Sequence, residues 1–182
     1  AALEENLVNE KTSFTCTGSI EVEGETIHCS NISGHGTQNF VEVISNSCNP
    51  AFIQIGQMLG AGKFRQYYQG FGFSDKTGID LPGEAEDSFW KEGKMGGVDL
   101  AVASFGQNFT ITPIQMITAC AAVSNGGYVV QPHVVSKITD SKGNVIKTVD
   151  KKVKRQVISD DTSKKMNEYL EYNTERQGAA AG

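Results

Sequence analysis

A short joint between two helix-like apolar runs is the feature that most constrains the fold of this chain. The joint reads Ser47-Cys48-Asn49-Pro50. Asn is a favourable helix N-cap, and Pro fits the first helical position, where its missing N–H costs no hydrogen bond. The sequence therefore predicts that Asn49 caps a helix beginning at Pro50, and that Ser47 and Asn49 project from a rigid joint. A hydroxyl and an amide held there can pass a proton and bind a peptide carbonyl, although such residues before a helix are more often simple caps.

The composition fits one soluble globular unit, or a large piece of one. The chain has 182 residues, 38% of them hydrophobic, and a net charge of −5. A short basic run at 151–155 is typical of the solvated face of a strand, so no nucleic-acid partner is predicted. No apolar stretch reaches the roughly 18 to 20 residues that cross a bilayer, and the first residues do not predict a signal peptide. Residues 1–7 resemble the last turns of a helix and residues 178–182 close no element, so we expect a fragment of a longer protein.

The cysteines give no local sign of a metal site. They stand at positions 16, 29, 48 and 120, without a Cys-x-x-Cys motif or a Cys/His pair at zinc spacing. We therefore expect neither a metal nor another cofactor. Cys16 and Cys29 fall on the two arms of an expected hairpin, where a disulfide and free buried thiols are both possible. Cys120 lies in an apolar helical stretch and is predicted to be in the core.

The first third of the chain predicts a hairpin and then a helix. Residues 13–29 carry apolar residues, beginning with Phe14, on either side of Glu23-Gly24, which predicts two antiparallel strands. His35 lies between two glycines, and a structural, hydrogen-bonded histidine fits this turn better than a catalytic base. Thr37 is expected to cap a helix that runs to about Asn46.

The other helices and strands are predicted from caps, glycines and apolar spacing. Thr112 and Gln115 form a capping box around Pro113. The expected helices are 50–59, ended by Gly60; 63–69, with Phe64, Tyr67 and Tyr68 in the core; 98–105; 112–125; and one that begins at Ser159-Asp160-Asp161 with Met166, Tyr169 and Leu170 on one face. Short strands are expected at 128–130, 134–138 and 145–149.

A Lys76-Thr77-Gly78 triplet lies in a segment that predicts a long ordered loop, residues 71–94. Such a triplet is catalytic in penicillin-recognising enzymes when it lies on a strand of the active site. Here Pro82 and Gly83 follow closely and indicate a turn. We therefore interpret this triplet as unrelated to catalysis.

Several segments, in order, resemble the transpeptidase domain of class B penicillin-binding proteins of the division, elongation and sporulation types. They are Gly34-His35-Gly36, Ser47-Cys48-Asn49-Pro50-Ala51-Phe52, Phe71-Gly72-Phe73 with the segment from Lys76 to Glu84, Gly106-Gln107 with Thr112-Pro113-Ile114-Gln115-Met116, and Asn125-Gly126-Gly127. The resemblance covers nearly the whole chain. It implies an α+β fold of the β-lactamase-like, penicillin-binding protein transpeptidase type.

The resemblance also implies how this chain is organised. We expect mainly the helical lobe of that fold, with peripheral β-hairpins and without most of the central sheet. Its parts would be a helix end plus hairpin (1–36), a helical lobe with the Ser-x-Asn motif and the long loop (37–127), and short strands with a last helix (128–182).

The resemblance implies a function for the joint. Ser47 and Asn49 would be catalytic residues, with Ser47 relaying protons and Asn49 positioning the catalytic lysine and the substrate amide. The family's nucleophilic Ser-x-x-Lys and its strand-borne Lys-Thr-Gly are not found at matching places here. We therefore expect a fragment of a D,D-transpeptidase that is inactive alone.

The implied partners are peptidoglycan stem peptides, β-lactam antibiotics, a glycosyltransferase, and division or elongation proteins. The implied location is the extracytoplasmic face of the bacterial membrane. The alternative function is a non-catalytic relative that binds cell-wall peptide or a division partner. A β-lactamase or β-lactam sensor fits less well, because the long loop shows no clear deacylating Glu.

Overall fold

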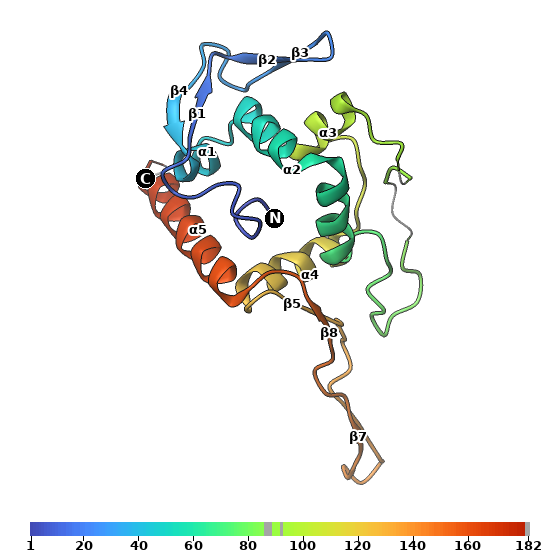
Figure 1. Ribbon diagram of the computed structural model, residues 1–182. Helices are drawn as coiled ribbons and strands as arrows, with labels where there is room; N and C mark the ends of the chain where they lie inside the picture. The colour runs from blue at the N-terminus through green and yellow to red at the C-terminus, as the bar shows by residue number, and fades with distance from the viewer. Residues whose placement is uncertain (86–88, 92, 181–182) are drawn as a thin grey trace.

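Helices form the body of the described chain, and short strands are attached at its edges (Figure 1). The computed structural model describes residues 1–85, 89–91 and 93–180, with side chains described as far as residue 175. The helices are α1 (Phe40–Ser45), α2 (Asn49–Gly70), α3 (Gly97–Ser104), α4 (Pro113–Ser124) and α5 (Asp160–Ala180). The strands are β1 (Ser13–Cys16), β2 (Ser19–Val22), β3 (Glu25–His28), β4 (Gly36–Asn39), β5 (Tyr128–Val130), β6 (Lys137–Thr139), β7 (Val145–Thr148) and β8 (Val153–Gln156). This content confirms the α+β class.

Within the described residues, the strands pair two by two and antiparallel. β2 and β3 form the expected hairpin around Glu23 and Gly24, which both have positive φ. β1 pairs instead with β4, so the hairpin predicted over residues 13–29 extends only over residues 19–28, and Phe14 is paired with Gln38. The chain turns away at Gly18, whose φ is +97°. The local alternation of apolar and polar residues cannot predict that a strand pairs with another some twenty residues further along the chain.

The helix before the joint begins later than predicted. Residues 36–39 form β4, and α1 starts at Phe40 with Asn39, not Thr37, as its N-cap. Asn39 Oδ1 accepts from the Glu42 amide at 3.0 Å, and Glu42 Oε2 accepts from the Asn39 amide at 2.8 Å. This reciprocal capping box outcompetes a single threonine cap.

The helix after the joint also differs at its start. Cys48 takes the N-cap position of α2, Asn49 is the first helical residue and Pro50 the second, so the prediction that Asn49 is the cap is wrong. Pro is tolerated there because the first turn has no intrahelical N–H partners. The predicted break at Gly60 is present, since this residue has φ +76° and ψ +156° inside α2.

The later helices follow their sequence signals more closely. α3 and α4 lie where predicted, and α4 begins with the Thr112 and Gln115 capping box. Cys120 on α4, which is predicted to be in the core, is exposed, and so is Leu170 on α5, which is expected to share one face with Met166 and Tyr169. Each follows a buried neighbour, Ala119 or Tyr169, and one residue turns an α-helix by about 100°, away from the packed face.

The core joins segments far apart in sequence. Its main cluster brings together the start of the chain, β1, α1, the first half of α2, and Tyr169 of α5. A second cluster packs Ile53 of α2 against Val22 of β2 and Ala101 of α3. The joint between α1 and α2 therefore lies on the main core, which holds its backbone in place.

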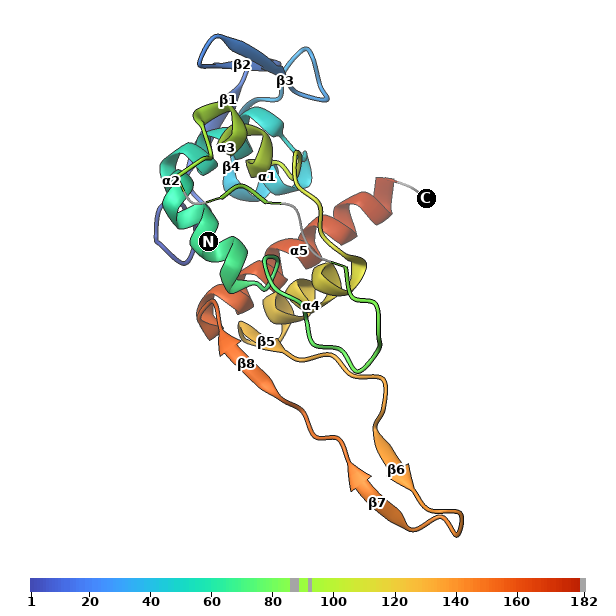
Figure 2. The same cartoon turned by 90° about the vertical axis from the view of Figure 1, so that its right-hand side faces the viewer.

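A long arm extends from the helical body (Figures 1 and 2). β5 and β8 pair at its base and β6 and β7 pair toward its tip. β6 starts at Lys137, three residues later than predicted, because Asp80 binds the amides of Val134 and Val135 at 2.8 and 3.0 Å. Among the described helices, none combines the length and apolar character that crossing a membrane requires.

Candidate functional site

Ser47 lies at the end of α1 in a backbone conformation that favours glycine. Its φ is +48°, in the left-handed region. The Ser47 amide donates to Ile44 O at 3.1 Å, and the Cys48 amide donates to Val43 O at 3.2 Å. These two bonds define a Schellman motif, in which Gly usually occupies the position of Ser47. A serine held there at a steric cost is a sign of a functional position.

Asn49 lies beside Ser47 and is tied to the hairpin. Its Nδ2 donates to His28 O, at the end of β3, at 3.2 Å. Ser47 is exposed, Asn49 is half-buried, and the Cys48 side chain between them is fully buried. The structure thus places the two predicted site residues together at the surface with the intervening residue anchored below. After the bond to His28, the Asn49 carboxamide still has an oxygen acceptor and a second N–H for a ligand.

Beneath the joint, three cysteines and a histidine converge, a cluster that sequence reasoning missed. The cysteine Sγ atoms of Cys16, Cys29 and Cys48 and a ring nitrogen of His35 all lie within 4.8 Å of one another. Cys29 Sγ and His35 Nδ1 are 3.6 Å apart. In the described part of the chain all four cysteines are free, so Cys16 and Cys29 approach each other without a disulfide. The partner of His35 fits its predicted structural role.

Two thiols of this cluster, those of Cys16 and Cys48, have very different pKa values. Burial, with a contribution from neighbouring Cys16, raises the pKa of Cys48 to about 12. Burial also acts to raise the pKa of Cys16, but hydrogen bonding from the backbone amides of Gly18 and His35, and from the side chains of His35 and Cys48, lowers it to about 7. Cys16 is therefore the thiol of this pair that ionises first.

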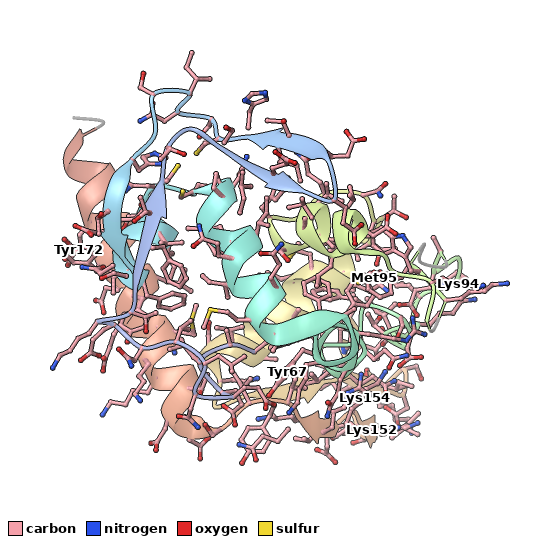
Figure 3. The ribbon with its side chains drawn as sticks, turned by 45° about the horizontal axis from the view of Figure 1, so that its top comes forward. Tyr67, Lys94, Met95, Lys152, Lys154 and Tyr172 are labelled. Atoms are coloured by element: carbon pink, nitrogen blue, oxygen red, sulfur yellow. The ribbon has the colours of Figure 1, made fainter. Side chains whose placement is uncertain are left out.

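The Lys76-Thr77-Gly78 triplet lies in a loop, as predicted, and is part of no strand. Glu84 closes the loop on it: Oε1 accepts from the Thr77 amide at 2.6 Å and Oε2 from the Gly78 amide at 2.9 Å. Thr77 is buried beneath this contact. Lys152 and Lys154, labelled in Figure 3, lie at the β8 end of the arm. In this view they are on the side of the molecule opposite to β1 and β4.

Comparison with known proteins assigns the chain to a family. Residues 1–182 match the penicillin binding protein transpeptidase domain. The chain belongs to the penicillin-binding protein transpeptidase family. The stage V sporulation protein D of Bacillus subtilis is 41% identical to this chain over 175 residues, which are 94% of the chain and 27% of that protein. The peptidoglycan D,D-transpeptidase MrdA of Acinetobacter baumannii is 38% identical over 113 residues, 57% of the chain and 17% of that protein.

Solved structures share the fold of this transpeptidase chain. A peptidoglycan synthetase from Bifidobacterium adolescentis superposes with a TM-score of 0.89 at 22% identity, over 98% of the chain and 33% of that structure. The D,D-transpeptidase domain of a peptidoglycan glycosyltransferase from Eggerthella lenta superposes with a TM-score of 0.85 at 22% identity, over 96% and 45%. The chain thus spans less than half of each of these relatives.

Proposed function

We propose that Ser47 and Asn49 are the Ser-x-Asn part of a D,D-transpeptidase active site. The observation that carries this proposal is the strained, exposed Ser47 beside a half-buried Asn49, at a joint fixed by a Schellman motif and the core. A backbone fixed in this way holds a hydroxyl and an amide in constant relative orientation, which is what positioning catalysis needs.

In the reaction we propose, the whole protein cross-links peptidoglycan stem peptides. A serine outside this chain attacks the carbonyl of the D-Ala-D-Ala bond, gives its proton to the catalytic lysine and forms an acyl-enzyme, and the terminal D-Ala leaves when its nitrogen receives a proton. The amine of a second stem peptide then attacks the acyl-enzyme and displaces the serine, which takes a proton back, and the cross-link is formed. The hydroxyl of Ser47 both donates and accepts, so it can pass that proton between the catalytic lysine and the leaving nitrogen. Asn49 orients the lysine and the substrate amide. The chain alone, without the attacking serine, is expected to be inactive.

β-Lactam binding follows from the same chemistry, because a β-lactam carbonyl acylates the same nucleophile in this family. The setting we propose is the extracytoplasmic face of the bacterial membrane, beside a glycosyltransferase and proteins of division or elongation. The support for this setting is the family membership and the names of the relatives.

The test measures acylation of the full-length protein by a fluorescent penicillin. We expect Ser47→Ala, Ser47→Gly and Asn49→Ala to slow labelling by about 100-fold or more, in the range of general acid–base contributions. Ser141→Ala, at the exposed turn of the arm, is the matched control and should label like the wild type. Gly relieves the left-handed strain at residue 47, by roughly 1 to 2 kcal/mol, whereas Ala keeps it.

The two Ser47 variants separate chemistry from folding. Slow labelling by both assigns the defect to the lost hydroxyl, whereas a defect in Ser47→Ala alone would assign it to the backbone and overturn the proton relay. A wild-type protein that penicillin does not label would instead favour the non-catalytic relative.

A further inference from the structure

The cysteine and histidine cluster is built from four separate places in the chain. Cys16 ends β1, Cys29 follows β3, His35 precedes β4, and Cys48 is the N-cap residue of α2. The three thiols are 0 to 4% exposed and the imidazole is half-buried. Such a convergence of soft, polarisable sulfur and imidazole donors is the kind of ligand set that a thiophilic metal ion binds.

The spacing of these donors suits one tetrahedral ion. With Zn–S bonds of about 2.3 Å and a Zn–N bond of about 2.0 to 2.1 Å, the edges of the tetrahedron are about 3.8 Å between sulfurs and about 3.6 Å between sulfur and nitrogen. Cys29 Sγ and His35 Nδ1 are 3.6 Å apart, and every other pair is within 4.8 Å. Binding would draw the more distant pairs together by up to about 1 Å through side-chain rotation.

The backbone that carries two of the donors is packed too tightly for any residue but glycine. A Cβ on Gly34 would lie 2.4 Å from Cys16 O, and a Cβ on Gly18 would lie 2.0 Å from Ile32 O. Both glycines also have positive φ, +82° and +97°. This close contact of two glycine turns fixes Cys16 beside His35 before any ligand arrives, so the donor set is preorganised.

We propose that Cys16, Cys29, His35 and Cys48 bind a Zn²⁺ ion. Three sulfurs and one imidazole in a tetrahedron are the donor set that zinc prefers, and four protein ligands leave no open position for substrate or water. The ion is therefore structural. Binding displaces the thiol protons, leaving three thiolates, a neutral imidazole and a net charge of −1 at the site.

The ion would fasten the Ser-x-Asn joint to the β-hairpins. Cys48 is the middle residue of Ser47-Cys48-Asn49, and Asn49 already contacts His28, next to Cys29. An ion held by Cys48 would fix the start of α2 and hence the orientation of both flanking side chains. This positioning effect rests on the proposed function, whereas the binding of zinc does not.

The first experiment measures metal content in the full-length protein. We expect about one equivalent of zinc per chain more in the wild type than in Cys29→Ser or His35→Ala, measured by inductively coupled plasma mass spectrometry. Cys120→Ser, which removes an exposed cysteine outside the cluster, is the matched control and should keep the wild-type content. Equal zinc in wild type and in folded ligand variants would overturn the proposal.

A second readout covers the case in which a ligand variant does not fold. Wild-type protein refilled with Co²⁺ should show the thiolate-to-cobalt charge-transfer band and the intense visible bands of a tetrahedral sulfur site. Absence of both, or thiol titration and mass spectrometry showing a disulfide between two cluster cysteines in the purified protein, would contradict the zinc site.

A third readout distinguishes this proposal from the proposed function. Ser47→Ala should keep its zinc while its labelling by penicillin slows by about 100-fold or more. Chelation should slow labelling of the wild type, and added Zn²⁺ should restore it. Zinc present without any effect of chelation on labelling would support the binding site and overturn its positioning role.

Discussion

The backbone at residue 47 destabilises the fold slightly, and it holds the Ser47 hydroxyl in place. Gly would relieve the left-handed backbone at this end of α1, and Ser keeps it at a cost of roughly 1 to 2 kcal/mol. The neighbouring Cys48 is 0% exposed, so one residue of the motif anchors while its two neighbours face outward. The buried Cys48 side chain thus anchors the motif, while the side chains of Ser47 and Asn49 on either side of it are presented at the surface.

The Glu84 carboxylate is expected to make the stability of the fold depend on pH. Burial acts to raise its pKa, but the hydrogen bonds from Thr77 and Gly78 outweigh burial and lower the pKa below its ordinary value of 4.5. A carboxyl with a lowered folded-state pKa stabilises the fold above the unfolded-state pKa, and this contribution is lost as the pH falls through the folded-state value. The contact should therefore matter at neutral pH and vanish in acid.

The measurement compares melting temperatures of wild-type and Glu84→Gln full-length protein from pH 7 to pH 3. We expect the wild type to be more stable at pH 7 and the difference to shrink as the pH falls. Glu25→Gln, in an exposed position of β3, is the control and should follow the wild type throughout. A difference that stays constant with pH would contradict the role of the Glu84 charge.

For single residues, the sequence predicted features that depend on adjacent residues. It missed features that depend on contacts between distant parts of the chain. It identified Ser47 and Asn49 as neighbours on a joint, because they are adjacent in the chain. It assigned the wrong cap at Asn49, since the joint turns one residue earlier, at Cys48. The convergence of Cys16, Cys29 and His35 with Cys48 depends on strand pairings that local spacing does not reveal.

At the scale of elements, α4 shows how a cap can also hold a loop. Gln115 Oε1 accepts from the Thr112 amide at 2.8 Å, which completes the capping box. Its Nε2 donates to Phe73 O at 3.1 Å and to Asp75 O at 3.0 Å. One amide, 3% exposed, thus begins the helix with its oxygen and fixes the loop before Lys76 with its nitrogen.

Gln115→Glu separates these two roles. The carboxylate keeps the acceptor for the capping box but turns an oxygen toward two loop carbonyls that then lose their donor. We expect the free energy of unfolding, measured by urea denaturation of the full-length protein, to fall by about 1 to 3 kcal/mol. Gln57→Glu, on an exposed position of α2, should change it little. If the two substitutions lowered the free energy of unfolding by the same small amount, the loop contacts of Gln115 would not contribute to stability.

The elements that the sequence predicted best have signals within a few residues. The capping box at Thr112 and the break at Gly60 are local features, and both are present. The pairing of β1 with β4 and the exposure of Cys120 depend on what packs nearby, and the predictions for both failed. A capping box at Asn39 and Glu42 was present in the sequence and would have placed the start of α1 correctly.

Over the whole molecule, the first ten residues tie distant helices together. Glu4 accepts from the Ser159 amide at 3.0 Å at the start of α5, Glu5 accepts from the Tyr67 hydroxyl of α2 at 2.8 Å, and Glu10 accepts from the Tyr169 hydroxyl. Figure 3 shows Tyr67 on the side of α2 near this segment. The core cluster behind the joint includes the same segment, so the position of Ser47 and Asn49 depends on both ends of the chain.

The most direct test is a crystal structure of the full-length protein acylated by a penicillin. We predict that Ser47 Oγ and an atom of the Asn49 carboxamide, Oδ1 or Nδ2, lie within hydrogen-bond distance, about 2.6 to 3.2 Å, of the catalytic lysine or of the bound penicillin's amide. An acylated serine on another face of the domain, with neither side chain in contact with the lysine or the ligand, would contradict it.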